Sequence, residues 1–268
     1  MSVITFLSDY GHADDFIGVC HGVMARICPE AHIIDITHAL PRHQVRPAAT
    51  VLRNALPYMP EDAVNLAIVD PDVGRERRAV ALRTGEDRLL VGPDNGLLSL
   101  AATRLGGVAE AVEISHSQFR LEPVAATFHG RDVFAPVAAH LAAGRALAET
   151  GEPLDPDEVV SVALPEPRIE DDVLIAHALY VDRFGNVQLN VTHADMAGSG
   201  LQLGRSLELE IGRERHPALY ASTFADVPRG EILVYEDASR MLAVAVNRGH
   251  AADQLELPLD CELRLRPA

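Results

Sequence analysis

The chain has 268 residues, of which 48% are hydrophobic and 23% charged, and its formal net charge is −16. This length allows one large domain or two ordinary ones, and this hydrophobic content excludes a disordered chain. An acidic chain without a basic tract argues against nucleic-acid binding, which needs clustered Lys and Arg against phosphates. Since no apolar run approaches the length of a membrane span, we expect no membrane partner either.

The strand and helix patterns alternate through the first half of the chain. Near-continuous apolar runs predict strands over residues 3–9, 31–40, 63–70, 79–84, 88–95 and 109–114. Apolar residues at helical spacing predict helices over residues 14–28, 45–59, 96–106 and 131–144. The first helix would carry Asp14 and Asp15 in its first turn, where the helix dipole favours acids. This alternation predicts an α/β domain over residues 1–165, with a mostly parallel sheet and helices on both faces.

The composition changes after this domain. Residues 151–172 contain many acids and the prolines Pro153, Pro156, Pro165 and Pro167, which indicates a linker. Short β-rich runs separated by turn residues then predict strands over residues 172–182, 186–191, 201–212, 231–237, 241–247 and 261–267. We therefore predict an all-β, barrel-like domain over residues 173–268.

The cysteines and the N-terminus bear on the compartment. Cys20, Cys28 and Cys261 are odd in number and form no CxxC pair. Buried thiols in a reducing cytoplasm explain them better than a disulfide framework or a zinc site. The sequence MSVITFLSDYG has no basic segment followed by a long apolar stretch, as a signal peptide would have. We therefore predict a soluble cytoplasmic protein.

Several charged groups follow strands of the predicted α/β domain or precede its last helix. Asp9 ends the first strand, Asp70 ends the third, and His129 directly precedes the last helix. Arg77 and Arg78 follow Asp70 after a turn that contains Pro and Gly. Because ligands of parallel α/β sheets bind beyond the carboxyl ends of the strands, we expect these groups to form one site. Each residue alone has an ordinary alternative, as a turn former, a solvated charge or a hydrogen-bonded histidine.

Other recognised sites are not indicated. The chain has no GxGxxG or P-loop motif and no GxSxG nucleophile motif. His12 and His21, with Asp9, Asp14 and Asp15, could suggest a metal site, but their spacing matches no compact ligand motif. A helix-capping role explains the two neighbouring acids better, so we predict no metal.

Six motifs in a fixed order resemble the S-adenosyl-L-methionine (SAM) hydroxide adenosyltransferase family, which is related to SAM-dependent chlorinases and fluorinases. They are LSDYGxxDDFIGVCHGVM, DITHALPRHQV, VDPDVGRERRAV, VGPDNGLLS, TFHGRDVFAPVAAHLA and VDRFGNVQLN. The resemblance implies an N-terminal α/β domain, a C-terminal β-barrel and hydrolysis of SAM to adenosine and L-methionine without a cofactor. It also implies a homotrimer, with each active site between the N-terminal domain of one subunit and the C-terminal domain of the next.

The resemblance further implies individual site residues. The catalytic Asp, Arg and His of the family correspond to Asp70, Arg77 and His129. The residues that would contact the substrate are Asp9 at the ribose hydroxyls, Asp14 and Asp15 at the first helix, Asp182, Phe184, Asn186, Ser239, Val246 and Arg248. From the chemistry of aromatic rings, Phe128 or Phe184 could stack on the base. In this assignment Asp182 would pair with the methionine ammonium group, and Asn186 would bind the adenine edge.

The chemistry of SAM indicates a role for each residue of the predicted catalytic set. Methionine is a ready leaving group, so displacement at the ribose 5′ carbon needs a positioned and activated water. Asp70 can accept a hydrogen bond from this water, and Arg77 supplies a fixed positive charge for a developing hydroxide. His129 can take or relay the proton near neutral pH. The residue types leave the final proton acceptor open.

Three alternatives stay open at this point. A SAM-dependent halogenase is disfavoured, because Asp70 would repel a halide. A sensor that binds SAM or adenosine without catalysis would not need the Asp-Arg-His set, and a metal-dependent hydrolase would be sensitive to chelators. The chain also departs from the family pattern, with Asp72 in place of a common Gly, Arg75 in place of a frequent Thr, and DASRMLA in place of an NSSGYLE-like segment.

Overall fold

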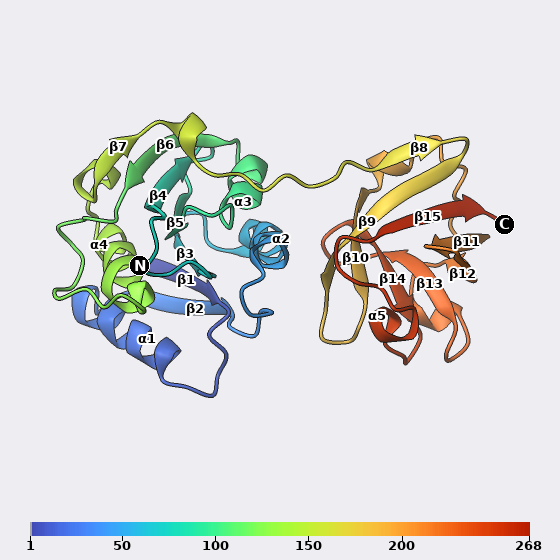
Figure 1. Ribbon diagram of the computed structural model, residues 1–268, viewed down its shortest axis with the longest axis horizontal. Helices are drawn as coiled ribbons and strands as arrows, with labels where there is room; N and C mark the ends of the chain where they lie inside the picture. Colours follow the sequence, from blue (N-terminus) through green and yellow to red (C-terminus); the bar gives the residue numbers. More distant parts are fainter. Residues whose placement is uncertain (1) are drawn as a thin grey trace. The chain divides into compact units, whose positions relative to one another are not determined.

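The computed structural model describes residues 2–268, and the chain divides into two compact units, Met1–Val162 and Ala163–Ala268. Each unit has its own buried hydrophobic clusters. The first unit combines a sheet with helices, and the second is built from strands (Figure 1). The predicted two-domain fold class is therefore confirmed.

The sheet of the first unit has seven strands in the order β2-β1-β3-β5-β4-β6-β7. Their bounds are β1 (Val3–Ser8), β2 (His32–Thr37), β3 (Val64–Ile68), β4 (Ala79–Thr84), β5 (Leu89–Pro93), β6 (Val108–Glu113) and β7 (Glu152–Leu154). The pairs β1–β2, β1–β3 and β3–β5 are parallel. The pairs β4–β5, β4–β6 and β6–β7 are antiparallel.

The expectation of a mostly parallel sheet is thus wrong for half of its pairings. A parallel connection needs a crossover of about a dozen residues or more. Only the turn at residues 85–88 lies between β4 and β5, so these two strands must form an antiparallel hairpin. The Thr-Gly-Glu-Asp sequence is typical of a tight turn, and a prediction from apolar strand patterns alone does not take it into account.

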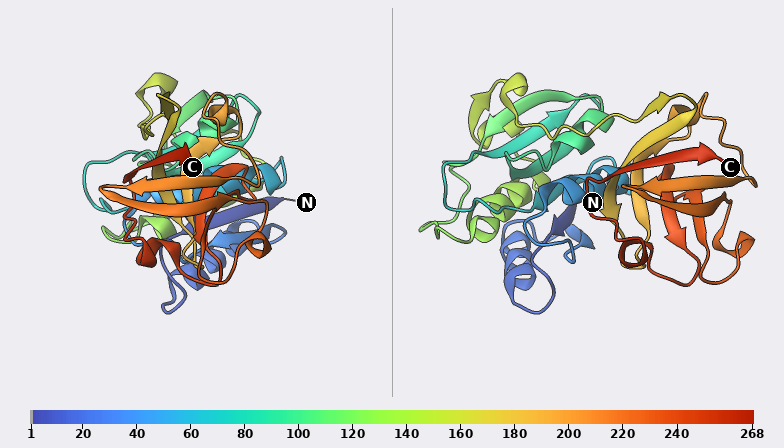
Figure 2. Two further views of the ribbon diagram at one scale, coloured as in Figure 1. Left: turned by 90° about the vertical axis from the view of Figure 1, so that its right-hand side faces the viewer. Right: turned by 45° about the vertical axis from the view of Figure 1, so that its right-hand side comes forward.

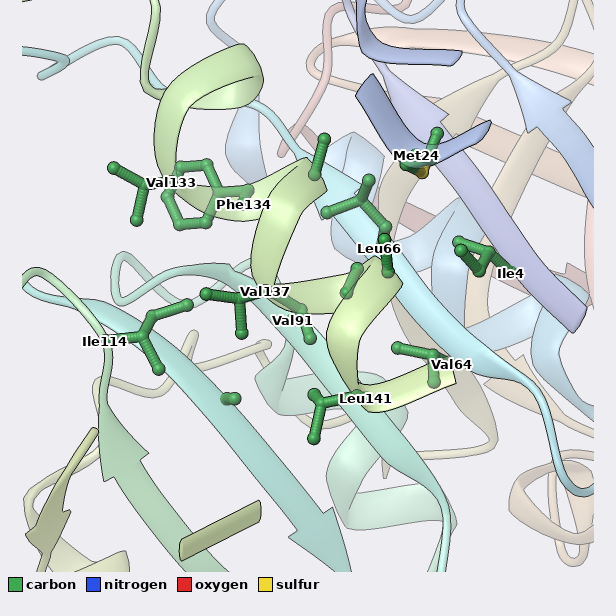
Figure 3. Close-up of a cluster of buried hydrophobic side chains, with 14 of the residues drawn as sticks. Ile4, Met24, Val64, Leu66, Val91, Ile114, Val133, Phe134, Val137 and Leu141 are labelled. Carbon is green, nitrogen blue, oxygen red and sulfur yellow. The ribbon is translucent and has the colours of Figure 1, made fainter. Parts of the chain in front are cut away.

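Helices cover both faces of this sheet, as predicted (Figure 1). Helix α1 (Phe16–Ile27) packs against α4 (Ala135–Ala142), and α2 (Val45–Ala55) packs against α3 (Ser99–Arg104). Helix α4 contributes Val137 and Leu141, one turn apart, to a buried cluster that also contains Val64 and Leu66 of β3 (Figure 3). Complete burial of such a side chain stabilises the fold by about 1.5–3 kcal/mol. Within residues 2–268, no helix is long and apolar enough to cross a membrane.

Helix α1 begins later than predicted, and this changes the role of two acids. Its first residue is Phe16, so Asp14 and Asp15 precede the helix. Asp15 occupies the N-cap position, but among the described residues its side chain makes no capping hydrogen bond. The helix-capping explanation of this pair is therefore wrong.

The second unit is a closed barrel (Figure 2). Its strands are β8 (Arg168–Glu170), β9 (Val173–Val181), β10 (Val187–Thr192), β11 (Ser206–Ile211), β12 (Glu214–Tyr220), β13 (Ile232–Glu236), β14 (Met241–Val246) and β15 (Glu262–Pro267). The sheet order is β10-β14-β13-β12-β11-β15-β9-β8, and a further pairing of β9 with β10 closes a ring of seven strands. Alternate residues such as Leu207 and Leu209 fill its interior. The short helix α5 (Ala251–Gln254) precedes the last strand.

The segment interpreted as a linker contains ordered structure. Within residues 151–172, β7 pairs with β6 of the first unit, and β8 pairs with β9 of the second. Both strands have only three residues and lie at sheet edges, where proline is tolerated. Composition indicates a loop here because such short edge strands have no hydrophobic pattern. Strand β12 was missed for a related reason, since Pro217 and its charged neighbours hide the strand pattern.

Candidate active site

The loop between β3 and β4 brings the first candidate residues together. Asp70 lies just beyond β3, and turn hydrogen bonds from Val73 to Asp70 and from Arg75 to Asp72 fold the chain back. Gly74 has φ +81°, and a Cβ atom there would lie 2.6 Å from the carbonyl oxygen of Ala126. Glycine therefore allows this loop to approach the segment that carries His129.

Asp70, Arg77 and His129 are in direct contact. Arg77 Nε donates to Asp70 Oδ1 at 2.8 Å, and Arg77 Nη2 donates to Asp70 Oδ2. Arg77 Nη2 also donates to His129 Nδ1 at 3.1 Å. The side chains of Arg77 and Asp70 are only 10% and 7% exposed, so this pair is largely shielded from solvent. The Arg77 guanidinium also lies 5.1 Å from the ring centre of Phe134. The structure thus brings together the three residues predicted to be catalytic.

The contact with Arg77 determines the protonation of His129. Because a guanidinium only donates, Nδ1 of His129 must accept, and the neutral ring carries its hydrogen on Nε2. Burial lowers the pKa of His129, and the nearby charge of Arg77 lowers it further. His129 is therefore held as a neutral imidazole with a fixed tautomer.

A π-helical turn, η2 (Gly130–Phe134), follows His129 and holds it in place. A Cβ atom at Gly130 would collide with the Tyr10 hydroxyl, so only glycine fits there. Asp132 accepts from the Ala125 backbone N–H at 2.8 Å and from Arg131 Nε at 2.6 Å. Burial alone would raise the pKa of Asp132, but these hydrogen bonds outweigh it and lower the pKa. The ionised carboxylate thereby fixes the loop on both sides of His129.

A cavity of about 370 Å³ opens beside this set. Of the predicted residues, its lining includes Asp9, Asp14, Asp70, Phe128 and His129. Arg77 lies on the other side of His129 and lines a second cavity of about 460 Å³. His129 therefore lines both cavities.

The cavity of 370 Å³ also has lining residues that were not predicted. They are Tyr10, Phe16, Arg42, His43, Val73, Thr127 and Gly130. All seven lie inside the quoted motifs, yet reasoning from residue types selected only the carboxylates, the imidazole and one aromatic ring. For Tyr10, Val73, Thr127 and Gly130, a position within three residues of Asp9, Asp70 or His129 is the signal that could have found them.

Asp9 is oriented by the backbone. The His43 N–H donates to Asp9 Oδ2 at 2.8 Å, and His43 has the left-handed φ of 65°. An unusual backbone conformation at a candidate site is thus used to aim an N–H group at a carboxylate. No pattern of residue types in the sequence predicts this contact.

Aromatic rings form one wall of the cavity. Phe128 contacts Phe16 edge to face with ring centres 5.1 Å apart, and contacts Tyr10 at 6.0 Å. Burial raises the pKa of Tyr10 well above its usual value, with further contributions from Cys20 and Asp70. Tyr10 therefore keeps its hydroxyl hydrogen, and the wall is uncharged.

The remaining predicted binding residues belong to the second unit. Asp182 Oδ1 accepts from the N–H groups of Phe184 and Asn186 at 2.8 and 2.9 Å. Asp182 Oδ2 accepts from Asn186 Nδ2 at 2.8 Å. Two residues expected to hold a ligand therefore also hold each other in the turn between β9 and β10. Phe184 is 69% exposed at the tip of this turn.

Val246 and Arg248 lie near the same turn, because the Ala252 N–H donates to the carbonyl oxygen of Gly185 at 3.0 Å. Val246 is buried at the end of β14, and Arg248 is exposed with φ 57°. Ser239 lies beyond the opposite end of β14, where its N–H donates to Asp237 Oδ1 at 2.8 Å. The structure thus groups five of the six predicted residues of this unit and places Ser239 at the other end of a strand.

The two units together define a class of protein. It has an α/β domain with a shielded carboxylate–guanidinium–imidazole set, followed by a closed β-barrel with an exposed aromatic turn. The family model described as SAM hydroxide adenosyltransferase N-terminal domain matches residues 4–151, and the C-terminal domain model matches residues 176–264. The chain therefore belongs to the SAM hydroxide adenosyltransferase family, as the sequence motifs predict.

Individual relatives agree with this assignment. A protein of Salinispora tropica named (R)-S-adenosyl-L-methionine hydrolase is 50% identical over 263 residues, which cover 98% of this chain and 97% of that protein. A crystal structure of an uncharacterized conserved protein from Thermotoga maritima has a TM-score of 0.92 and 36% identity, covering 98% of this chain and 99% of that one. A fluorinase of Actinoplanes is more distant, at 30% identity with 91% of each chain covered.

Proposed function

We propose that this protein hydrolyses SAM to adenosine and L-methionine. The contact of Asp70, Arg77 and His129 beside a cavity that also contains Asp9 is the observation that carries the proposal. The name of the Salinispora tropica relative, at 50% identity, supports the same substrate and favours the (R) epimer of the sulfonium.

The proposed reaction is an in-line displacement. A water oxygen attacks the ribose 5′ carbon, the C–S bond breaks, and its electron pair returns to sulfur to give methionine. The water loses one proton, so the balance requires an acceptor but no oxidant, reductant or metal. We accordingly propose that SAM hydrolysis here needs no cofactor.

The hydrogen bonds of Asp70, Arg77 and His129 indicate a different role for each residue in the proposed reaction. Asp70 lines the cavity and has lone pairs beyond those used by Arg77, so it accepts a hydrogen from the water. His129 offers its Nε2–H to the water oxygen, because Nδ1 is engaged by Arg77. Arg77 holds both partners and adds a fixed positive charge that favours a developing hydroxide. The final proton acceptor in this scheme is Asp70, since neutral His129 has no second free lone pair.

The substrate contacts follow from the chemistry of the nucleoside. In our proposal Asp9, aimed by His43, bridges the ribose hydroxyls, and Phe128 provides an aromatic face. Asp14 lines the same cavity, whereas Asp15 lies at the start of α1. The barrel would contribute Asp182, Phe184, Asn186, Ser239, Val246 and Arg248 to the adenine and methionine groups.

We further propose a homotrimer in which the barrel of a neighbouring subunit completes each active site. Mixed trimers test this directly. We expect Asp70→Ala subunits to lose turnover and Asn186→Ala subunits to bind SAM weakly, so that each has little activity alone at low SAM concentration. When the two are unfolded and refolded together, part of the activity at that SAM concentration should return. Light scattering should give three chains per particle. No regained activity in mixed trimers of confirmed composition would place each site within one subunit. Location in the cytoplasm stays a prediction, based on the three unpaired cysteines of the described chain.

The test of the activity itself is product analysis. Purified protein is incubated with the (R) and (S) epimers of SAM, with and without excess chloride, and the nucleosides are separated by chromatography. Adenosine and methionine in equal amounts from the (R) epimer, independent of chloride, are expected. A chlorinated nucleoside would assign a halogenase, and tight SAM binding without turnover would assign a sensor.

A further inference from the structure

Three potential metal ligands meet outside the proposed reaction centre. They are His21 on α1, Asp35 on β2, and His38 just beyond β2. Helix α1 and strand β2 lie side by side (Figure 1). His21 Nε2 lies 2.9 Å from Asp35 Oδ1, and His38 Nε2 lies 3.0 Å from the same oxygen. One ligand atom of each residue lies within 4.8 Å of the other two.

His38 is held with one nitrogen directed at this cluster. Its side chain is 1% exposed, its Nδ1 lies 2.7 Å from Ser8 Oγ, and its ring lies 4.6 Å from that of Phe6. The opposite nitrogen, Nε2, has no hydrogen bond of acceptable geometry within residues 2–268, although Asp35 is close. A buried polar atom without a hydrogen bond needs an explanation, and an ion at this position would supply it.

The donor set fits a transition metal. Two imidazole nitrogens and one carboxylate oxygen are ligands of zinc and of related divalent ions. With metal–ligand bonds of about 2.0–2.1 Å, tetrahedral ligand atoms lie about 3.3 Å apart, so each histidine nitrogen must move away from Asp35 Oδ1 by only about 0.3–0.4 Å. His21 and Asp35 are 33% and 40% exposed, which leaves them free to adjust and gives the ion a path of entry. The net charge of −16 also favours cation binding.

We propose that His21, Asp35 and His38 bind one divalent transition-metal ion, with water completing the coordination. The role of this ion is structural. It would join α1 to β2 and, through the contact of His38 with Ser8, to the end of β1 that carries Asp9. The proposal does not depend on the reaction of the protein, and it concerns none of the groups that act on the water.

The test is zinc binding to tag-free protein after treatment with a chelator, measured by calorimetry. One saturable site per chain is expected. His21→Ala and Asp35→Asn should each weaken zinc binding at least about tenfold. His32→Ala is the matched control, since His32 is an exposed histidine on the same strand and the chain has 12 histidines that could bind zinc weakly. The control should bind like the wild type.

Cobalt provides a second readout that does not rely on variants. Wild-type protein with one equivalent of Co²⁺ should develop the visible absorption of a low-coordinate N/O site, which Zn²⁺ should abolish by displacement. Absence of a saturable site, or equal zinc affinity in His21→Ala, Asp35→Asn and His32→Ala, would overturn the proposal. If a variant fails to fold, as judged by circular dichroism, a wild type without the cobalt band overturns it equally.

Discussion

The candidate residues of the two units are organised in opposite ways. In the α/β unit, the Asp70 and Arg77 side chains are largely buried, and Arg77 is hydrogen-bonded to both Asp70 and His129. In the barrel, Phe184 and Arg248 are exposed, and the turn that carries Phe184 is held by its own hydrogen bonds. In the proposed mechanism, the groups that activate the water are therefore organised before substrate arrives, whereas the barrel residues would recognise the substrate from an exposed turn. Variants should therefore affect turnover in the first unit and substrate affinity in the second.

The largest effect is expected from Arg77→Gln. Loss of the guanidinium removes the positive charge beside Asp70 and frees His129 to change tautomer. We expect kcat to fall about 10²–10³-fold, which corresponds to about 2.7–4 kcal/mol of transition-state stabilisation. The measurement is steady-state adenosine formation from SAM. Arg75→Gln is the matched control, because Arg75 lies in the same loop with a 78% exposed side chain. Equal rates in the two variants would remove Arg77 from the mechanism.

Gly74→Ala should disturb the same set through the backbone. The added Cβ would meet the Ala126 carbonyl oxygen, so the loop must move away from the segment before His129. We expect kcat to fall about tenfold, because the catalytic groups are displaced. The unfolding free energy should fall by more than the cost of about 1–2 kcal/mol that a Cβ atom brings in the left-handed conformation. Gly107→Ala supplies the control, since Gly107 has φ +83° but open space around it. Identical losses of stability in denaturant titrations, with turnover intact in both, would contradict the proposed close approach.

Phe184→Ala tests the barrel. This ring is 69% exposed, so its removal should change the unfolding free energy by less than about 0.5 kcal/mol. If the ring stacks on the substrate, KM should rise about 3–10-fold while kcat is nearly unchanged. Leu203→Ala, which removes another exposed apolar side chain of this unit, should leave both constants as in the wild type. An unchanged KM for Phe184→Ala would exclude this residue from the binding surface.

The smallest effect concerns pH. The pKa of His129 is lowered from its usual 6.5 by burial and then by Arg77, so the folded protein keeps this ring neutral below pH 6.5. A histidine with an unshifted pKa would be half protonated at pH 6.5 and would lose about half of the activity there. We expect a smaller loss of activity at pH 6.5, because the acidic limb of the kcat/KM profile should lie below this pH. An acidic limb above pH 6.5 would show that His129 is not the neutral group that the reaction needs.

The same shift has a consequence for stability. Since the folded pKa lies below the unfolded value, the unfolded chain takes up the proton first as the pH falls. The contribution of neutral His129 is therefore fully present above pH 6.5 and is lost progressively below it. His38 and His140 have lowered pKa values for the same primary reason, burial, and act in the same direction.

The sequence motifs predict part of the candidate site, and the structure adds contacts that the motifs do not show. Asp70, Arg77 and His129 could be grouped from sequence because each stands next to a predicted strand or helix boundary. The contribution of His43 could not, because its backbone N–H reaches Asp9 from a loop 34 residues away. Likewise, the three proposed metal ligands come from a helix, a strand and a loop, with no spacing that a ligand motif would show.

The sequence by itself determined the two-domain fold class, the family and the residue types available for catalysis. These properties depend on local hydrophobic periodicity and on ordered motifs, both of which are readable along the chain. The tertiary structure alone decided the antiparallel half of the first sheet, the closure of the barrel by β9 and β10, and the tautomer of His129. Each of these depends on which groups meet across long stretches of sequence, and only the folded chain brings those groups within hydrogen-bonding distance.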